Sequence, residues 1–562
     1  MSASEVKLSR NELLKESIPS LAGHIAETLR DSATDRFSED DEQFLKFHGI
    51  YQQDDRDKRK TGKQYIFMVR GRIPGGVVTS AQYLVFDSLS DRHANGTLRI
   101  TSRQGFQFHG VVKSGLGPLI KSINEALLST LAACGDVNRN VMAPATPPGN
   151  AVCRQVHEDA RRVSDALLPQ TKAYHAIWVE GVQLDLEEPA QKEFVDPLYG
   201  KTYLPRKFKV AFAIPPLNDV DLLANCLGFA AIIENGRLAG YNLTAGGGMG
   251  MSHGNAATYP RVADVIAFVE PEQVVEAAKA VLTIHRDFGD RSNRKHARLK
   301  YVVAEKGVAW FRAELESRLG VRLADPRPFA FTKQGDAFGW HEQEDGRKFL
   351  TLYVESGRIK DTGNYRLKTA LRQIAERLAV EFRLTPSSSL ILANVAPADQ
   401  PVITEILARH GIPVENQARA IRLASMACVA LPTCGLALAE GERFLPTLMT
   451  LLENLLEEVG LKDEEITVRL TGCPNGCARP YLAELALVGK APGKYNLLLG
   501  GNASSTRLNR AYREGVKEAD LANELRPLLT RFRQDRNPGE RFGDWAARVI
   551  WPELVATAQK AA

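Results

Sequence analysis

The chain has 562 residues, of which 44% are hydrophobic and 25% charged, a composition that is typical of globular proteins and excludes a disordered or fibrous one. This length predicts roughly two to four domains. The 72 lysines and arginines exceed the 67 aspartates and glutamates by a formal charge of only +5, so neither nucleic acid nor a membrane surface is expected as the main partner.

The N-terminal residues argue against a secretory signal. Charged side chains are spread along them, from Glu5 to Glu16, and leave no apolar stretch of sufficient length. No run of about 18 apolar residues, the length of a membrane helix, occurs elsewhere. The seven cysteines are a small, odd number for this length, which favours reduced thiols or metal ligands over disulfides. We therefore expect a soluble, cytoplasmic protein.

Residues 1–63 are predicted to form a solvated N-terminal arm. The segment opens with an amphipathic helical pattern and continues into two charge runs, Ser38–Glu42 and Asp54–Lys60. Such runs are typical of a surface that faces water.

The folded body is predicted to begin at residue 64. A β-rich run over 64–70 ends at the turn Pro74–Gly76, a helical segment covers 79–90, and strands follow near 97–103 and 106–112. These elements make a strand, helix and strand unit.

A similar unit recurs about 284 residues later, counted from one strand to its counterpart. It consists of a strand in Leu350–Arg358, a helix over 366–380, and strands at 382–385 and 390–395. Leu98–Thr101 and Phe382–Thr385 occupy matching places.

A second pair of segments also corresponds. Phe208–Asn218 resembles Ile466–Asn475 in its strand, its turn and its ending in proline and asparagine. We infer an internal duplication, which would place a ligand between the two halves. The alternative is chance similarity between ordinary strand, helix and strand units.

Four of the seven cysteines are paired in loops rich in proline, glycine, asparagine and threonine. Cys428 and Cys434 form a Cys-x5-Cys pair, and Cys473 and Cys477 form a Cys-x3-Cys pair. Four thiolates on such loops favour a 4Fe-4S cluster. A structural zinc site is the alternative, although the five-residue spacer fits it poorly. The three isolated cysteines are expected to be small buried hydrophobes: Cys134, Cys153 and Cys226.

Several cations stand in strand or loop settings. Lys207 and Lys209 are two residues apart on a predicted strand and so project from the same face. Two adjacent ammonium groups repel each other unless an anion lies between them. Arg70, Arg103 and Arg139 have similar surroundings, and for each cation the alternative is an ordinary solvated side chain.

Together these motifs become recognisable. The chain carries, in this order, Ser102–Gly110, Asn138–Val141, Tyr203–Lys209, Gly246–Gly248 and both cysteine pairs. It resembles the siroheme- and 4Fe-4S-dependent sulfite and nitrite reductases over nearly all of its length from about residue 60. Within this family it is most similar to the hemoprotein (beta) subunits of bacterial assimilatory NADPH-dependent sulfite reductases.

The resemblance implies an α+β fold with internal duplication, pseudo-twofold symmetry, three domains, and mixed β-sheets flanked by helices. Siroheme would lie at the domain junction. The expected limits are an N-terminal arm over 1–63, a duplicated ferredoxin-like half domain over 64–132 and 334–405, a siroheme- and substrate-binding domain over 133–333, and a 4Fe-4S- and siroheme-binding domain over 406–562.

The resemblance also assigns roles to single residues. Four cations match the substrate-binding residues of the family: Arg70, Arg139, Lys207 and Lys209. Four more residues lie in segments that contact siroheme: Arg103, Gln107, His109 and Asn475. Cys477 would bridge siroheme and the cluster, and Cys428, Cys434 and Cys473 would complete the cluster.

The implied reaction is the six-electron reduction of sulfite to sulfide in assimilatory sulfate reduction and cysteine biosynthesis. Gly246–Gly250 lacks the strand-to-helix setting of a dinucleotide fingerprint, so electrons must come from another protein. We expect a flavoprotein (alpha) subunit that uses NADPH, with ferredoxin as the alternative donor. Two other functions stay open, namely nitrite reduction and a non-catalytic protein with a structural zinc site.

Overall fold

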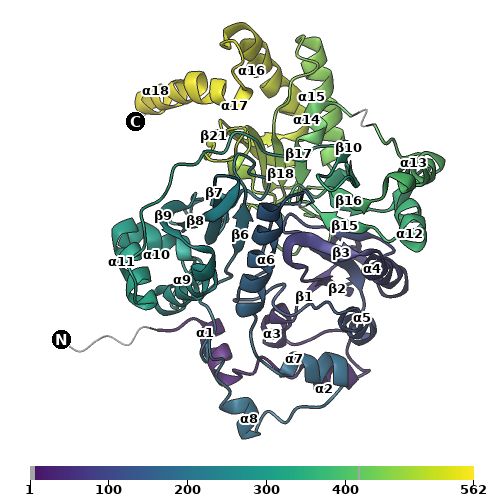
Figure 1. Ribbon diagram of the computed structural model, residues 1–562, viewed down its shortest axis with the longest axis vertical. Coiled ribbons are helices and arrows are strands. Elements are labelled where there is room, and N and C mark those ends of the chain that lie inside the picture. The colour runs from purple at the N-terminus through teal and green to yellow at the C-terminus, as the bar shows by residue number, and fades with distance from the viewer. Residues whose placement is uncertain (1–6, 148, 416–417, 562) are drawn as a thin grey trace.

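The computed structural model describes residues 7–147, 149–415 and 418–561, in which helices and strands alternate around four larger sheets (Figure 1). The first sheet has the order β1-β2-β5-β4-β12 and the second the order β10-β11-β16-β15-β3. The bounds in the first sheet are β1 (Ile50–Asp54), β2 (Tyr65–Arg70), β5 (Phe106–Val111), β4 (Leu98–Ile100) and β12 (Arg358–Ile359). Those in the second are β10 (Gly339–Glu342), β11 (Lys348–Leu352), β16 (Leu390–Val395), β15 (Glu381–Leu384) and β3 (Val77–Thr79).

These two sheets correspond strand for strand and exchange one strand with each other. β12, from the second half of the chain, pairs with β4 through Arg358 and Arg99. β3, from the first half, pairs with β15 through Val78 and Phe382. This reciprocal exchange confirms the predicted duplication and its pseudo-twofold arrangement, and it shows that neither half forms a complete sheet alone.

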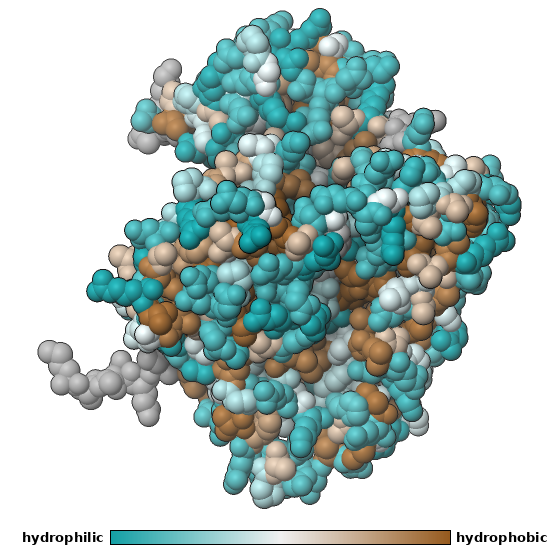
Figure 2. Space-filling view, viewed as in Figure 1, coloured by the Kyte–Doolittle hydropathy of each residue, from teal (hydrophilic) through white to brown (hydrophobic). Residues whose placement is uncertain are grey.

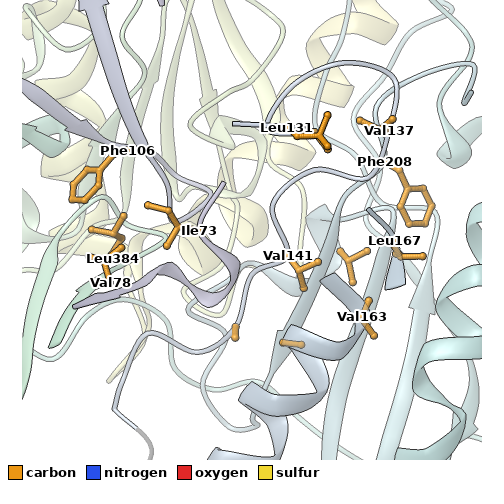
Figure 3. Packing of buried hydrophobic residues seen from close by; sticks show 14 of the residues in the cluster. Ile73, Val78, Phe106, Leu131, Val137, Val141, Val163, Leu167, Phe208 and Leu384 are labelled. Carbon is orange, nitrogen blue, oxygen red and sulfur yellow. The ribbon is translucent and has the colours of Figure 1, made fainter. Parts of the chain in front are cut away.

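The seam between the halves is packed with apolar side chains. α4 (Ser80–His93) begins at a capping box made by Thr79 and Gln82, directly after the exchanged strand. Its Tyr83 stacks on Phe382 of the other half with ring centroids 4.2 Å apart. Figure 3 shows Val78, Leu384 and Phe106 gathered at this seam. In the second half, α12 (Leu367–Arg377) is the counterpart of α4.

The third and fourth sheets contain both parallel and antiparallel pairs, and their loops carry the predicted lysines and the paired cysteines. The third has the order β6-β7-β8-β9, and the fourth has the order β17-β18-β19-β20-β21. The bounds in the third are β6 (Val210–Ala213), β7 (Leu227–Glu234), β8 (Arg237–Ala245) and β9 (Asp264–Val269). Those in the fourth are β17 (Ser425–Ala427), β18 (Val468–Thr471), β19 (Leu485–Ala491), β20 (Lys494–Leu499) and β21 (Arg510–Lys517).

Helices cover these two sheets. The longer ones near the third sheet are α6 (Ala151–Ala166), α9 (Val274–Phe288), α10 (Leu299–Lys306) and α11 (Val308–Leu319). Those near the fourth are α15 (Leu445–Glu458), α16 (Leu521–Asp535) and α18 (Trp551–Ala561), and α5 (Lys113–Glu125) lies beside α4. A large core runs from Leu21 to Ile412, and a separate core spans Ile421 to Ile550. The face of the molecule shown in Figure 2 is mostly hydrophilic.

The prediction of a solvated N-terminal arm is wrong for most of that segment. α1 (Arg10–Ser17), α2 (Ile25–Arg30) and α3 (Asp41–Phe47) pack on the body, and Phe44 and Leu45 are almost completely buried. β1 pairs along its whole length with β2. The charge runs masked these apolar positions in the sequence. Among the described residues of this segment, the longest exposed stretch begins at Asp57 and continues to Gln64. The domain limits expected from the sequence stay a prediction. Within the described residues, no helix is long and apolar enough to cross a membrane.

Candidate functional site

The candidate site lies where loops of the first sheet meet loops of the third and fourth sheets. Ser102 Oγ donates to the carbonyl oxygen of Cys477 at 3.0 Å. The amide of Met251, at the end of the glycine-rich loop, donates to the carbonyl oxygen of Pro474 at 2.9 Å. Five sequence segments that are far apart in the chain therefore converge: Thr101–Gly105, Asn138–Asn140, Arg206–Lys209, Gly246–Met251 and Cys473–Arg479.

Parallel pairing aligns two of these segments. Asn138 bridges to Phe208, and Met142 bridges to Ala211, both in the parallel sense. Arg139 therefore lies beside the segment that leads through Lys209 into β6, and its amide donates to the carbonyl oxygen of Phe208 at 3.0 Å. The sequence predicted these cations singly, and the pairing brings them together.

Lys207 and Lys209 are half-buried and have no counter-ion. Within the described part of the chain, neither ammonium group forms a hydrogen bond or an ion pair. Burial, together with Arg206 and Arg298, lowers the pKa of Lys207 to about 7. Burial and Arg103 lower the pKa of Lys209 well below its ordinary value. Such a site is short of negative charge and fits an anionic ligand.

Arg70 and Arg139 form the second part of the cationic group. The guanidinium of Arg70 donates to Cys134 Sγ at 3.3 Å and to the carbonyl oxygen of Ala133 at 3.5 Å. Arg139 Nε donates to the carbonyl oxygen of Gly135 at 2.7 Å. In the amide orientation that satisfies both groups, Gln107 Oε1 accepts from Arg70 Nη2 at 2.7 Å. Gln107 thus holds Arg70 at the end of β2.

Polar groups around Arg103 are buried without partners. Arg103 donates to Asn225 Oδ1 at 2.8 Å and to the carbonyl oxygen of Asn140 at 2.6 Å, but its Nε has no acceptor. Both amide atoms of Asn138, the Nε of Arg298 and one amide oxygen of Asn140 are also unsatisfied. Buried polar groups are nearly always paired, so this concentration of unpaired atoms indicates a polar ligand.

The four paired cysteines gather where two parallel strands end. Cys428 follows β17 and Cys473 lies two residues after β18, and parallel neighbours present their carboxyl ends at one edge. Gly472 N donates to Cys428 Sγ at 3.3 Å, and Asn475 Nδ2 lies 3.5 Å from Cys473 Sγ. Cys477, the most exposed of the four, faces the Ser102 loop.

The thiols are close enough to affect one another. All of them are free, and burial together with Cys477 raises the pKa of Cys473 to about 11 and that of Cys428 further. Four thiolates would therefore require a positive metal centre to stay ionised together. Backbone and amide donors to the sulfurs are the hydrogen bonds that tune iron–sulfur clusters.

The five-residue spacer between Cys428 and Cys434 fits the zinc alternative poorly. Zinc holds its sulfur ligands at about 2.3 Å, which draws four thiolates tightly around one ion. Among the described residues, no three His, Cys, Asp or Glu side chains are arranged to hold a single metal ion. Four thiols on two loops also suit a cluster, whose ligands bind separate iron atoms.

His109 contacts a different arginine from the one that Gln107 contacts. It is buried on the same face of β5, and its Nδ1 is 3.2 Å from Arg358 Nη1. Arg358 in turn pairs with Glu442, whose amide donates to the carbonyl oxygen of Cys428. His109 therefore connects with the cluster loop through this network, and its predicted contact with siroheme stays a prediction.

Sequence reasoning missed several residues of the site. Arg206, Arg298, Lys300 and Asn225 contribute cations or polar groups, and only Arg206 stood within a quoted motif. Lys300 Nζ, completely buried, donates to the carbonyl oxygens of Gly248 at 3.2 Å and Gly250 at 2.8 Å. Lys300 holds a loop that is about fifty residues away in the sequence, and no local sequence pattern identifies a lysine with such a role.

Comparisons with known proteins agree with this architecture. A family profile described as the nitrite/sulfite reductase ferredoxin-like half domain matches residues 58–126 and 341–410, which are the two halves that exchange strands. A second, described as the nitrite and sulphite reductase 4Fe-4S domain, matches residues 137–323. The four paired cysteines lie beyond that stretch, on the fourth sheet.

Full-length relatives are also similar. The sulfite reductase [NADPH] hemoprotein beta-component of Myxococcus xanthus is 52% identical, with 98% of each chain covered. That of Geobacillus kaustophilus is 49% identical, over 96% of this chain and 95% of the relative. The solved structure of Mycobacterium tuberculosis NirA matches with a TM-score of 0.79 at 24% identity, covering 96% of both chains, and shows the same fold.

Proposed function

The chain belongs to the nitrite and sulfite reductase family, and from this premise we propose that it reduces sulfite to sulfide as the hemoprotein component of an NADPH-dependent sulfite reductase. The observation that carries the proposal is the pair of unpaired ammonium groups on Lys207 and Lys209 beside four gathered thiols. Sulfite is a small oxyanion, and its reduction supplies sulfide for assimilation and cysteine biosynthesis.

The residues present fit both cofactors of the family. Cys428, Cys434, Cys473 and Cys477 would hold the 4Fe-4S cluster, with Cys477 also reaching siroheme across the Ser102 loop. The unsatisfied atoms of Arg103, Asn138 and Arg298 suit the carboxylates of siroheme. When bound, the coupled pair supplies electrons one at a time to sulfite.

The cationic side chains account for anion binding. Lys207, Lys209, Arg70 and Arg139 carry no ion pair in the described part of the chain, so a sulfite oxygen would not compete with a carboxylate. The four side chains are already held in place by the fold, and fixed charges stabilise developing negative charge without reorganisation.

The lysines and arginines of this group have different roles in proton transfer. Reduction of sulfite to hydrogen sulfide ion consumes six electrons and seven protons and releases three waters, so each broken S–O bond needs protons. Lys207, with a pKa of about 7, holds a proton that it can give up near neutral pH. Arginine keeps its proton and therefore binds the oxyanion without titrating.

Electrons must be supplied by another protein. The glycine-rich loop Gly246–Gly250 follows β8 and leads into β-bridged loops, with no helix at which a dinucleotide phosphate could bind. We assign the donor as a flavoprotein that uses NADPH, with ferredoxin as the second candidate, and place the enzyme in the cytoplasm, where thiols stay reduced.

Sulfite and nitrite turnover by the purified holoprotein distinguishes the two reductase activities. With reduced methyl viologen as donor, we expect sulfide as the product and a kcat/KM for sulfite above that for nitrite. Metal analysis should give about five irons per chain, four in the cluster and one in siroheme. One zinc per chain without iron, or ammonia formation with no sulfide, would overturn the proposal.

A further inference from the structure

The charge run Asp54–Lys60 has no part in the cofactor or substrate site, yet it lies against the cluster loop. The amide of Arg56 donates to the carbonyl oxygen of Pro432 at 3.3 Å, and its guanidinium donates to that of Ala437 at 2.5 Å. These two acceptors flank Cys434 on either side. Asp57 adds an ion pair to Arg443 at 2.6 Å. The 3-10 helix η1 (Arg56–Thr61) is therefore fixed beside one cluster ligand.

The Cys434 loop also exposes an apolar side chain. Cys434 is half-buried, Gly435 and Leu436 follow it at the surface, and Leu436 is 66% exposed. Cys473 is buried, and Cys477 faces the Ser102 loop within the substrate region. Cys477 is the more exposed thiol, but Cys434 is the one whose loop is fixed against η1 and exposes Leu436.

Exposed cations follow Arg56 in the segment that is fixed against this loop. Residues 57–63 contain Lys58, Arg59, Lys60 and Lys63 against the single acid Asp57, and all are exposed. Lys58 and Arg59 lie near Asp55 and Asp54, whereas Lys60 and Lys63 have no carboxylate partner within the described residues. Residues 57–63 thus carry a net charge of +3.

The geometry points to a docking surface formed by Leu436 and residues 56–63, onto which an acidic flavoprotein places its flavin edge beside Cys434. This inference rests on the proposed function, because only a redox enzyme without its own dinucleotide site needs such a partner. Protein interfaces commonly have an apolar centre with a polar, charged rim, and opposite charge accelerates their formation. A partner with acidic side chains around its contact surface would complement the cations of residues 56–63.

Charge reversal on the rim tests the surface. The triple variant K58E/K60E/K63E should bind the flavoprotein component from the same organism about tenfold more weakly, with a smaller dependence on salt, as measured by biolayer interferometry. NADPH-driven sulfite turnover should fall by a similar factor. Turnover with reduced methyl viologen, a small donor that needs no docking, should stay within about twofold of the wild type.

Matched controls use exposed residues elsewhere. The variant K121E/K172E/K201E carries the same charge change at exposed lysines that form no ion pair with the residues the structure describes, and it should behave as the wild type does. Leu436→Ala should weaken binding, whereas Leu127→Ala, at a position that is 89% exposed, should not.

Several results would overturn the inference. Equal binding by the two triple variants would show that the charge run is an ordinary solvated surface, even if sulfite turnover with methyl viologen proved the proposed function right. Absence of any binding between the wild-type chain and the flavoprotein would also overturn the inference. A wild-type dimer that becomes monomeric in K58E/K60E/K63E would assign the face to a second copy of the chain instead. Failure of the wild type to reduce sulfite with methyl viologen would contradict the proposed function itself.

Discussion

Arg70 and Arg139 come from different elements but donate to the same acceptor, the carbonyl oxygen of Ala133, at 3.5 and 3.4 Å. Two guanidinium groups that share one backbone oxygen, with no carboxylate between them, repel each other at close range. The arrangement is stabilised when an anion binds to both. Lys207 and Lys209 likewise lie near each other without a carboxylate partner among the described residues, so the site as a whole is complementary to an oxyanion.

Replacing Lys209 by methionine should lower sulfite turnover while leaving the cofactors in place. The side chain keeps a similar length but loses its charge, and we expect turnover with methyl viologen to fall by about tenfold or more, or about 1.4 kcal/mol of transition-state stabilisation. The absorption spectrum and iron content should be unchanged. Lys201→Met, at an exposed position, serves as the control. Wild-type kinetics in a fully loaded Lys209→Met would show that the lysine is only a surface cation.

Cys477→Ser should remove both cofactors. A thiolate shared by cluster and siroheme holds the two together, and a hydroxyl is a poor ligand for iron. We expect loss of the visible absorption of both groups, measured together with iron and sulfide content. Cys153→Ser lies on α6, away from the four thiols, and should retain both. Normal cofactor content in Cys477→Ser would show that another residue provides the bridge.

Much of the fold could be predicted because its local signals are strong. The strands around Ile100 and Phe382 and the helices that precede them lie where the hydrophobic pattern placed them. The exchange of β3 and β12 between halves could not be predicted, since pairing partners hundreds of residues apart leave no periodic signal. The buried N-terminal helices were missed because charged neighbours masked Phe44 and Leu45.

The residues of the candidate site also differ in how far the sequence could predict them. The cysteine pairs stood out by their spacing, whereas the substrate role of the lysines at 207 and 209 came from the family resemblance and stays a prediction. Arg298 and Lys300 could not, because each is isolated in sequence and gains its role only by packing under loops from other segments. His109 was placed in the correct strand, but its partner Arg358 comes from the exchanged strand and could not be foreseen.

The cofactor-free protein should become more stable as pH rises above neutral, partly through Lys207. Its folded pKa of about 7 lies below the unfolded value of about 10.4, so between these values the unfolded chain binds a proton that the folded chain does not. The free energy of unfolding therefore increases with pH in this window. Thermal melts from pH 7 to 10 should show a steeper rise for the wild type than for Lys207→Met, and sulfite should flatten the wild-type curve. Identical slopes for the two proteins would contradict the assigned burial of this ammonium group.

Asp221→Asn should destabilise the junction between the third and fourth sheets. Asp221 is completely buried, pairs with Arg469 at 2.7 Å, and also accepts from Arg479, two residues after Cys477. Although burial alone would raise the pKa of Asp221, the two guanidinium groups lower it, so the carboxylate stays charged.

Removal of this charge leaves two buried guanidinium groups without a counter-ion. The loss of such a partner typically lowers the free energy of unfolding by about 3–5 kcal/mol, because the desolvation of each guanidinium is no longer offset. Arg479 also donates to the carbonyl oxygens of Ser102 and Pro386, at 2.8 and 3.0 Å, and so holds the cluster loop against both halves of the duplication. Urea unfolding of Asp221→Asn should therefore show the loss of stability together with reduced cofactor content. Asp345→Asn, which breaks an exposed pair with Arg347, should change the free energy of unfolding by less than about 1 kcal/mol. If Asp221→Asn proved no less stable than Asp345→Asn, the two arginines would have to be held by their backbone acceptors alone.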